Sequence, residues 1–159
     1  IFAIITDIND APNPHDKSRH RIEQMISTYK LNEAIIRLPF TDSVERYYAA
    51  SDIIVAPFVV PHFSRAIIEA GAMGKPVVGS RIGGITEIVD EGITGLLAMP
   101  GAPADLACKI LFLLENEKLA SEMGNAGYVK AKSQFDAAVY AQSVMKLYED
   151  ILTDTSSQK

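Results

Sequence analysis

Short runs of β-branched apolar residues alternate with amphipathic segments along this chain, and this alternation limits the possible folds more than any other feature. Apolar runs of strand length occur at residues 1–6, 34–38, 52–57, 76–80 and 94–99. Helical spacing of apolar residues predicts helices near residues 16–30, 42–50, 64–73 and 86–90, and from about 104, 118 and 137. We expect Asp42 to cap the second of these helices. Strands alternating with helices at this spacing predict an α/β fold, a Rossmann-like parallel sheet with helices on both faces.

The composition suits one globular domain. The chain has 159 residues, of which 48% are hydrophobic and 22% charged, and this length can bury a full core without metal or disulfides. We place the domain at residues 1–152 and expect a disordered tail at 153–159. Cys108 lies among apolar residues, so we expect it to be buried, and a single cysteine fits a reducing compartment. The chain begins on an apolar run without a methionine, which indicates a fragment of a longer protein.

The charge balance argues against two classes of partner. The formal net charge is -5 at pH 7, and no run of Lys or Arg occurs. Surfaces for nucleic acids or anionic membranes need clustered positive charge, so no nucleic acid is expected as a partner. No apolar run approaches the roughly 20 residues that cross a bilayer, so no transmembrane segment is expected either.

Gly74-Lys75 raises the question of a phosphate-binding loop. Such a loop needs a glycine, four residues and then Gly-Lys-Ser/Thr, between a strand and the helix that follows it. Here only two residues separate Gly71 from Gly74, Pro76 replaces the hydroxyl residue, and the predicted helix comes first. Gly74 instead suits a left-handed residue just past a helix that Pro76 prevents from continuing, with Lys75 near the negative helix end. We therefore reject the phosphate-loop interpretation.

The amino end of the helix predicted at 64–73 is the better anion site. Ligands of open parallel sheets bind at the carboxyl ends of the strands, which are followed here by the loops 6–13, 39–43, 57–65 and 80–87. The first N–H groups of a helix lack internal partners and carry about half a positive charge, which favours a phosphate. Glu69 lies about a turn and a half inside this helix, either as a solvated residue or as a carboxylate that binds the vicinal hydroxyls of a ribose.

A group of glycines follows the next predicted strand. Gly79, Gly83 and Gly84 lack the G-x-G-x-x-G spacing of a dinucleotide fingerprint. The pair Gly83-Gly84 marks either a plain turn or a second backbone-lined loop at the same sheet edge.

The segment from Asp52 to Leu97 resembles a known family. It is similar to the C-terminal, donor-binding half of retaining GT-B glycosyltransferases, the large glycogen-synthase-like and sucrose-synthase-like group of family 4 type. The motifs of that family occur here in the same order, at Ser51-Asp52, Pro57, Glu69-Ala70, Ala72, Gly74, Pro76-Val77-Val78, Gly83-Gly84, Glu87, Gly92 and Gly95. The fold that the resemblance implies is the C-terminal half of a GT-B fold.

The resemblance implies roles for several residues. Glu69 matches the second glutamate of the family's E-x7-E motif, which binds the ribose hydroxyls of the donor nucleotide. Phe63, Ser64 and Arg65 match the loop whose backbone amides face the donor sugar and the diphosphate. The Gly83-Gly84 pair matches a loop beside the donor pocket.

Two further positions concern the base and the sugar of the donor. The stretch from Leu38 to Phe40 matches the strand end where the nucleotide base usually rests. The first glutamate of E-x7-E, which touches donor-sugar hydroxyls in the family, falls on Pro61 here. His62, beside this gap, either takes over a hydrogen bond to the sugar or is a plain loop histidine.

By the same resemblance, the substrate is a nucleotide diphosphate sugar such as a UDP- or GDP-sugar, and neither a metal nor another cofactor is expected. The basic pair that neutralises the diphosphate, the acceptor site and the catalytic histidine would lie before residue 1, the latter two in an N-terminal acceptor domain. No catalytic residue is therefore assigned in this chain. The full-length protein would be a cytoplasmic hexosyltransferase, peripheral to a membrane in some settings, whereas this fragment alone would transfer nothing.

Three alternatives stay open at the level of sequence. A sugar-nucleotide epimerase would share the architecture and the diphosphate site. A non-catalytic nucleotide-sugar-binding module is favoured by Pro61. A receiver-type signalling domain needs an acidic cluster with a phosphorylatable aspartate, which Asp7 and Asp10 match poorly.

Overall fold

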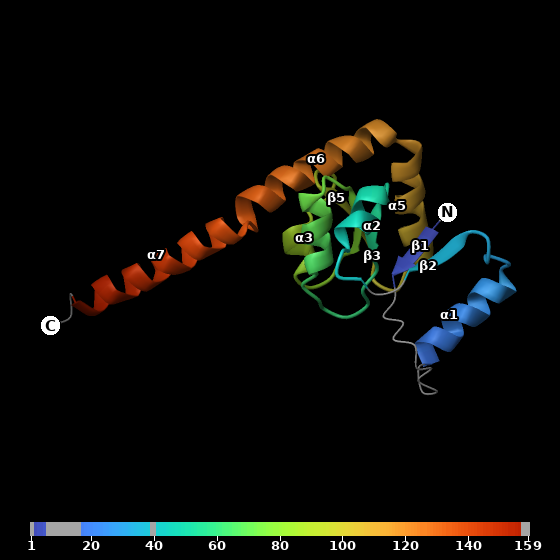
Figure 1. Cartoon of the computed structure of the whole chain (residues 1–159), viewed down its shortest axis with the longest axis horizontal. Helices are drawn as coiled ribbons and strands as arrows, with labels where there is room; N and C mark the ends of the chain where they lie inside the picture. Colours follow the sequence, from blue (N-terminus) through green and yellow to red (C-terminus); the bar gives the residue numbers. More distant parts are fainter. Residues whose placement is uncertain (1, 6–16, 39–40, 157–159) are drawn as a thin grey trace. The chain divides into compact units, whose positions relative to one another are not determined.

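The computed structural model describes residues 2–5, 17–38 and 41–156 (Figure 1). The chain divides into two compact units, residues 1–44 and 45–159. The first unit contains strand β1 (Phe2–Ile5), helix α1 (Lys17–Thr28) and strand β2 (Ile35–Leu38). The two strands are parallel, with Phe2 opposite Ile35 and Ile5 opposite Leu38. Parallel strands need a long crossover connection, and in this unit α1 forms part of it.

The second unit contains most of the secondary structure. Its elements are α2 (Glu45–Ala50), β3 (Ile54–Ala56), α3 (Arg65–Ala72), β4 (Val77–Ser80), α4 (Ile85–Ile88), β5 (Gly95–Ala98), α5 (Pro103–Glu115), α6 (Glu117–Gln134) and α7 (Ala137–Ser156). The strands form a parallel sheet in the order β3-β4-β5, and every residue of β4 and β5 is buried. Continuous burial is expected where helices cover both faces of a parallel sheet. The predicted α/β fold with a parallel sheet is confirmed.

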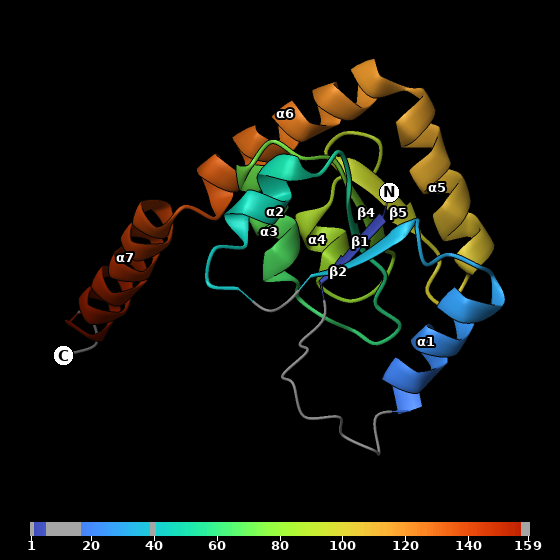
Figure 2. The same ribbon diagram turned by 45° about the vertical axis from the view of Figure 1, so that its right-hand side comes forward.

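The core of the second unit lies between the sheet and the helices α5 and α6. Val78 of β4, Leu96 of β5, Leu113 of α5 and Met123 of α6 form one buried cluster. Helix α6 also packs closely along α3, and both views show the two helices side by side (Figures 1 and 2). A Cβ atom at Gly71 of α3 would lie 3.1 Å from the carbonyl oxygen of Gly127 of α6. Glycine therefore permits this close approach, which holds α3 in place.

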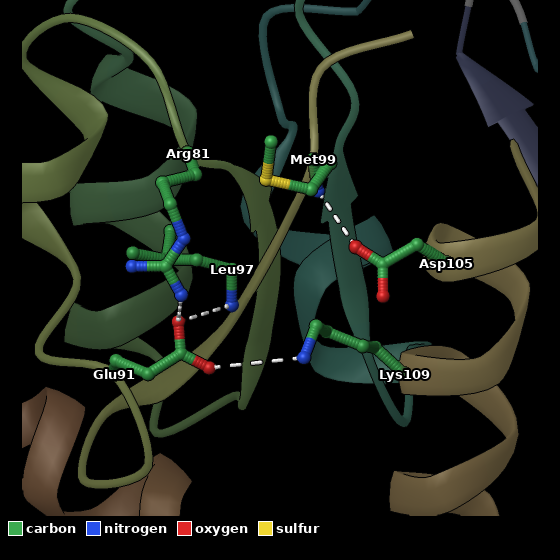
Figure 3. Close-up of polar contacts among 6 residues, drawn as sticks. All are labelled: Arg81, Glu91, Leu97, Met99, Asp105 and Lys109. Carbon is green, nitrogen blue, oxygen red and sulfur yellow. Dashed lines mark hydrogen bonds and ion pairs between the residues drawn. The ribbon is translucent and has the colours of Figure 1, made fainter. Parts of the chain in front are cut away.

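Strand β5 ends the sheet of the second unit, and acidic side chains bind backbone N–H groups of β5 and of the residue that follows it (Figure 3). The Glu91 carboxylate accepts hydrogen bonds from the Leu97 N–H at 3.1 Å and from Arg81 Nη2 at 2.6 Å. Asp105 Oδ2 accepts one from the Met99 N–H at 2.7 Å. An uncovered strand edge can pair with another chain, and these carboxylates occupy the donors that such pairing would use.

Three predictions about local structure are wrong. Asp42 does not cap α2, because that helix begins at Glu45 and residues 41–44 form a preceding turn, in which the Ser43 N–H donates to the Thr41 hydroxyl. Cys108 is exposed, because Leu106, Ile110 and Leu113 form the inner face of α5 and Cys108 lies on the outer face.

The third concerns the end of the chain. Helix α7 runs through Ser156, so residues 153–156 of the predicted disordered tail are helical. The Thr153 hydroxyl donates to the Glu149 and Asp150 carbonyls, so its polar group has hydrogen-bond partners within the helix. Residues 157–159 lie outside the described residues. Among the helices that the structure describes, none is long and apolar enough to cross a membrane.

Candidate functional site

The amino end of α3 is built by the loop that leaves β3. This loop covers residues 57–64, and Ser64, which precedes the helix, has extended backbone angles of φ -96° and ψ 108°. Ser64 is 1% exposed, and within the described part of the chain its hydroxyl makes no capping hydrogen bond to the helix. The N–H groups of the first helical turn are therefore not neutralised by a side-chain cap. Such an end carries about half a positive charge and favours an anion.

The Gly83-Gly84 loop contacts the loop before α3. Because β3 and β4 are parallel neighbours, the segments that leave them lie at the same sheet edge. Gly83 has a φ of +55°, and a Cβ atom there would lie 2.9 Å from the His62 backbone nitrogen. A Cβ atom at Gly84 would lie 2.7 Å from Cδ2 of Phe63. Side chains at these positions would separate the two loops, so the glycines belong to one backbone-lined rim with residues 61–63.

Aromatic contacts hold this rim while leaving its side chains accessible. The His62 ring stacks on Phe58, with ring centroids 4.2 Å apart and an interplanar angle of 29°. Phe63 meets Phe135 edge-on at 6.5 Å and is still 51% exposed. His62 is exposed as well, so its ring is open to a ligand on the face away from Phe58. Its predicted hydrogen bond to a sugar stays a prediction.

Glu69 lies further along α3, about 7.5 Å from Ser64 along the helix axis at a rise of 1.5 Å per residue. The residue is exposed, yet its Oε2 atom accepts a hydrogen bond of 2.9 Å from the Tyr48 hydroxyl of α2. Tyr48 is 6% exposed. Burial, the hydrogen bond to Glu69 and the negative charge of that carboxylate raise the pKa of the Tyr48 hydroxyl well above its ordinary value. The phenol therefore stays a proton donor throughout the physiological pH range.

The sequence reasoning missed Tyr48, and no local pattern identifies it. Its partner lies 21 residues away on another helix, and only packing brings the two side chains together. Arg81 was also missed, although an arginine directly after β4, in a loop predicted to face the ligand, was visible in the sequence. Its guanidinium is paired with Glu91, which reduces the positive charge it offers to an anion.

The structure describes Arg65 and Leu38 but not Phe40. Arg65 is the first residue of α3 and is exposed, so its cation lies at the end of the helix where the macrodipole favours anions. Leu38 is the last residue of β2 and is half-buried within the first unit. Phe40 lies outside the described residues. The contact of Leu38 and Phe40 with a nucleotide base stays a prediction.

Lys75 is not part of this site. Gly74 has a φ of +66° just past α3, and the Lys75 N–H donates to the Ala70 carbonyl at 2.9 Å, which closes the helix. The Lys75 ammonium donates to the Ala49 carbonyl in the last turn of α2, also at 2.9 Å. The predicted helix ending is confirmed, and a cation at the carboxyl end of a helix is stabilising.

The family model of glycosyl transferases group 1 matches residues 15–130. This chain belongs to the glycosyl transferases group 1 family. The match covers most of the chain, including the rim, Tyr48 and Glu69, and the resemblance noted in the sequence is confirmed.

Two relatives match most of this chain. The chain is 28% identical over 138 residues to N-acetyl-alpha-D-glucosaminyl L-malate synthase of Bacillus anthracis, which covers 87% of this chain and 36% of that protein. It is 30% identical over 139 residues to D-inositol 3-phosphate glycosyltransferase of Corynebacterium glutamicum, with 87% of this chain and 32% of that protein covered. The chain thus spans about a third of the length of these relatives.

The solved structures show the same GT-B architecture. The crystal structure of HepE from Anabaena in complex with UDP superposes with a TM-score of 0.86 at 26% identity. The superposition covers 93% of this chain and 40% of that one. The fold of the group 1 family is therefore present across nearly the whole chain.

Proposed function

We propose that this chain is the donor-binding domain of a retaining glycosyltransferase, which transfers a sugar from a nucleotide diphosphate sugar to an acceptor. One observation carries the proposal: the uncapped amino end of α3 is rimmed by residues 61–63 and Gly83-Gly84, and the Glu69 carboxylate follows on the same helix. That arrangement offers backbone N–H donors to a diphosphate and an acceptor to a diol. Membership of the group 1 family and the UDP bound to HepE support this assignment.

The chemistry assigns a specific task to the amino end of α3. When the bond between the sugar and the diphosphate breaks, negative charge grows on the departing diphosphate. The backbone N–H groups near residues 63–65 would stabilise that charge, together with the guanidinium of Arg65. Preorganised hydrogen-bond donors of this kind typically lower the activation free energy by about 3 kcal/mol each. The acceptor and its activating group would come from the part of a longer enzyme that this chain does not contain.

Titration calorimetry with UDP, GDP and ADP tests the proposal on the chain itself. We expect one of the three diphosphates to bind, with Glu69→Ala lowering its affinity about tenfold through loss of the ribose hydrogen bonds. Glu115→Ala is the matched control, because Glu115 is an exposed glutamate at the end of α5. Equal effects of the two substitutions, or no binding of any diphosphate, would reject the assignment.

A second candidate is a nucleotide-sugar-binding module without transferase activity. Pro61 favours it, because that position holds a carboxylate for the donor sugar in the resembled family. The two functions differ in turnover and not in binding. The test uses a longer protein that contains this chain. If that protein releases the nucleoside diphosphate from the bound sugar nucleotide, the transferase is favoured, whereas binding without any turnover favours the module.

A further inference from the structure

The carboxylate of Glu69 is held by a side chain outside its own helix. Tyr48 lies on α2, Glu69 lies on α3, and the Tyr48 hydroxyl donates to Glu69 Oε2 at 2.9 Å. Both views show α2 beside α3 (Figures 1 and 2). The contact therefore connects the position of one helix to the side chain that projects from the other.

The two partners differ in their freedom to move. Tyr48 is 6% exposed, and packing fixes its ring. Glu69 is exposed, and a glutamate on a helix surface ordinarily samples several rotamers. A bond from a fixed donor to a mobile acceptor selects one rotamer of the acceptor. The Glu69 carboxylate is consequently oriented before any ligand arrives.

The hydrogen bond from Tyr48 leaves most of the lone-pair sites of the Glu69 carboxylate available. Tyrosine donates one proton, and an ionised carboxylate has about four lone-pair sites on its two oxygens. With Tyr48 on Oε2, the Oε1 atom and a second site on Oε2 still accept hydrogen bonds. Two adjacent hydroxyls, such as the 2′- and 3′-hydroxyls of a ribose, present two O–H donors at a matching spacing.

We propose that Tyr48 is a positioning residue for ribose recognition, which holds the Glu69 carboxylate in the orientation that accepts both hydroxyls of the nucleotide. This inference rests on the proposed function, in which Glu69 binds the ribose. It adds a residue on α2 to the site. Recognition of the ribose, not of the base or the diphosphate, then depends on Tyr48. The raised pKa of the Tyr48 hydroxyl agrees with it, because the phenol keeps its proton and the bond persists through neutral pH.

Binding of two ligands to the full chain tests the inference. The probes are the nucleoside diphosphate among UDP, GDP and ADP that binds best, and its 2′,3′-dideoxy analogue, which lacks both hydroxyls. In the wild-type chain we expect the ribonucleotide to bind about tenfold more tightly than the analogue. Tyr48→Phe should lower ribonucleotide affinity about three- to tenfold and leave the affinity for the analogue unchanged.

Tyr47→Phe is the matched control. Tyr47 is the neighbouring tyrosine on α2, and its backbone carbonyl, not its hydroxyl, accepts a hydrogen bond from the Ser51 side chain. We expect no change with either ligand in this variant. In a Glu69→Ala background, Tyr48→Phe should have no further effect, because the group that Tyr48 positions is gone.

Each remaining outcome counts against a specific statement. If the wild-type chain binds both ligands equally well, Glu69 does not recognise the ribose hydroxyls, and Tyr48 cannot position it for that purpose. A wild-type chain that prefers the ribonucleotide, with Tyr48→Phe keeping that preference, would overturn only the role of Tyr48. An equal loss for both ligands, or a variant that fails to fold, would assign Tyr48 to stability and overturn the inference as well.

Discussion

A Cβ atom at Gly84 would lie 2.7 Å from Cδ2 of Phe63, a distance that real side chains do not reach. The close approach of Gly84 to the Phe63 ring brings the loop after β4 against the loop before α3. The absence of a side chain at Gly84 thus determines how close the two walls of the candidate site lie. A change of one methyl group at this position tests whether the spacing matters for binding.

Gly84→Ala should displace Phe63 and weaken nucleotide binding. We expect a loss of about 1–3 kcal/mol in the free energy of unfolding, since overpacking forces the ring or the backbone to move. Affinity for the preferred nucleoside diphosphate should fall in the same variant. Calorimetry and thermal unfolding measure the two effects.

Gly127→Ala is the control for this change. A Cβ atom at Gly127 would meet the Cα atom of Gly71 at 3.5 Å, which is ordinary contact. Alanine also favours a helix over glycine by about 1 kcal/mol, so stability should be kept or raised. If Gly84→Ala bound nucleotide as well as Gly127→Ala does, the rim formed by residues 61–63 and Gly83-Gly84 would have no part in the site.

Lys75→Met should reduce stability and leave nucleotide binding intact. The ammonium donates to the Ala49 carbonyl at 2.9 Å, so its removal should lower the free energy of unfolding by about 1 kcal/mol. Affinity for the nucleoside diphosphate should stay within about twofold of the wild type, because Lys75 lies at the opposite end of α3 from the rim. A loss of a hundredfold or more in affinity would return Lys75 to the role of a phosphate-loop lysine.

The alternation of apolar runs and helical segments was enough to predict the parallel sheet, because burial on both faces leaves a continuous apolar pattern in β4 and β5. The end of α3 could be predicted from Gly74 and Pro76 as well. A glycine just past a helix, with a proline shortly after it, is a common helix ending. Such local signals predict where elements end and which loops share an edge. The position of Gly83-Gly84 at the same sheet edge as the loop before α3 was predicted in this way, and the parallel pairing of β3 with β4 agrees with it.

Contacts between side chains on different helices were beyond sequence reasoning. The bond from Tyr48 to Glu69 depends on the angle and depth at which α2 packs beside α3. Cys108 illustrates the same limit, because its apolar neighbours in the sequence are not its neighbours in space. A helix turns by about 100° per residue, so the burial of one position depends on which stripe meets the sheet.

Glu91 should stabilise the edge of the sheet, and two substitutions separate its two functions. Glu91→Gln keeps an acceptor for the Leu97 N–H and loses the charge that pairs with Arg81. We expect it to cost less than about 1 kcal/mol, because exposed ion pairs contribute little. Glu91→Ala also leaves the N–H without its partner and should cost about 1–2 kcal/mol. Equal costs in urea unfolding would show that the bond to the strand contributes nothing.

The raised pKa of Tyr48 predicts a stability change in alkali. A free phenol has a pKa of about 10, so above that pH the unfolded chain loses the Tyr48 proton while the folded chain keeps it. The unfolded state then binds fewer protons, and the free energy of unfolding falls as pH rises, by at most about 1.4 kcal/mol per pH unit. Tyr48→Phe lacks this contribution.

The measurement is the difference in the free energy of unfolding between wild type and Tyr48→Phe, from pH 8.5 to about 11.5. The contribution of the hydroxyl is fully present below the pKa of the free phenol, so the difference should be constant there and shrink above it. Other tyrosines and lysines titrate in both proteins and cancel. A difference that stays constant across the whole range would contradict a raised pKa at Tyr48.

His62→Ala and His62→Phe distinguish a hydrogen bond to the donor sugar from a purely structural stack. His62 lies against Phe58 with ring centroids 4.2 Å apart, and phenylalanine can keep this stacking while it removes both ring nitrogens. If His62 replaces the carboxylate that is missing at Pro61, both variants should bind the sugar nucleotide about three- to tenfold more weakly, and both should bind the nucleoside diphosphate normally. Binding of the two ligands by each variant decides the matter. A phenylalanine variant with wild-type affinity for the sugar nucleotide would assign the histidine to the stack alone, and recognition of the sugar would then fall to the exposed backbone of the rim.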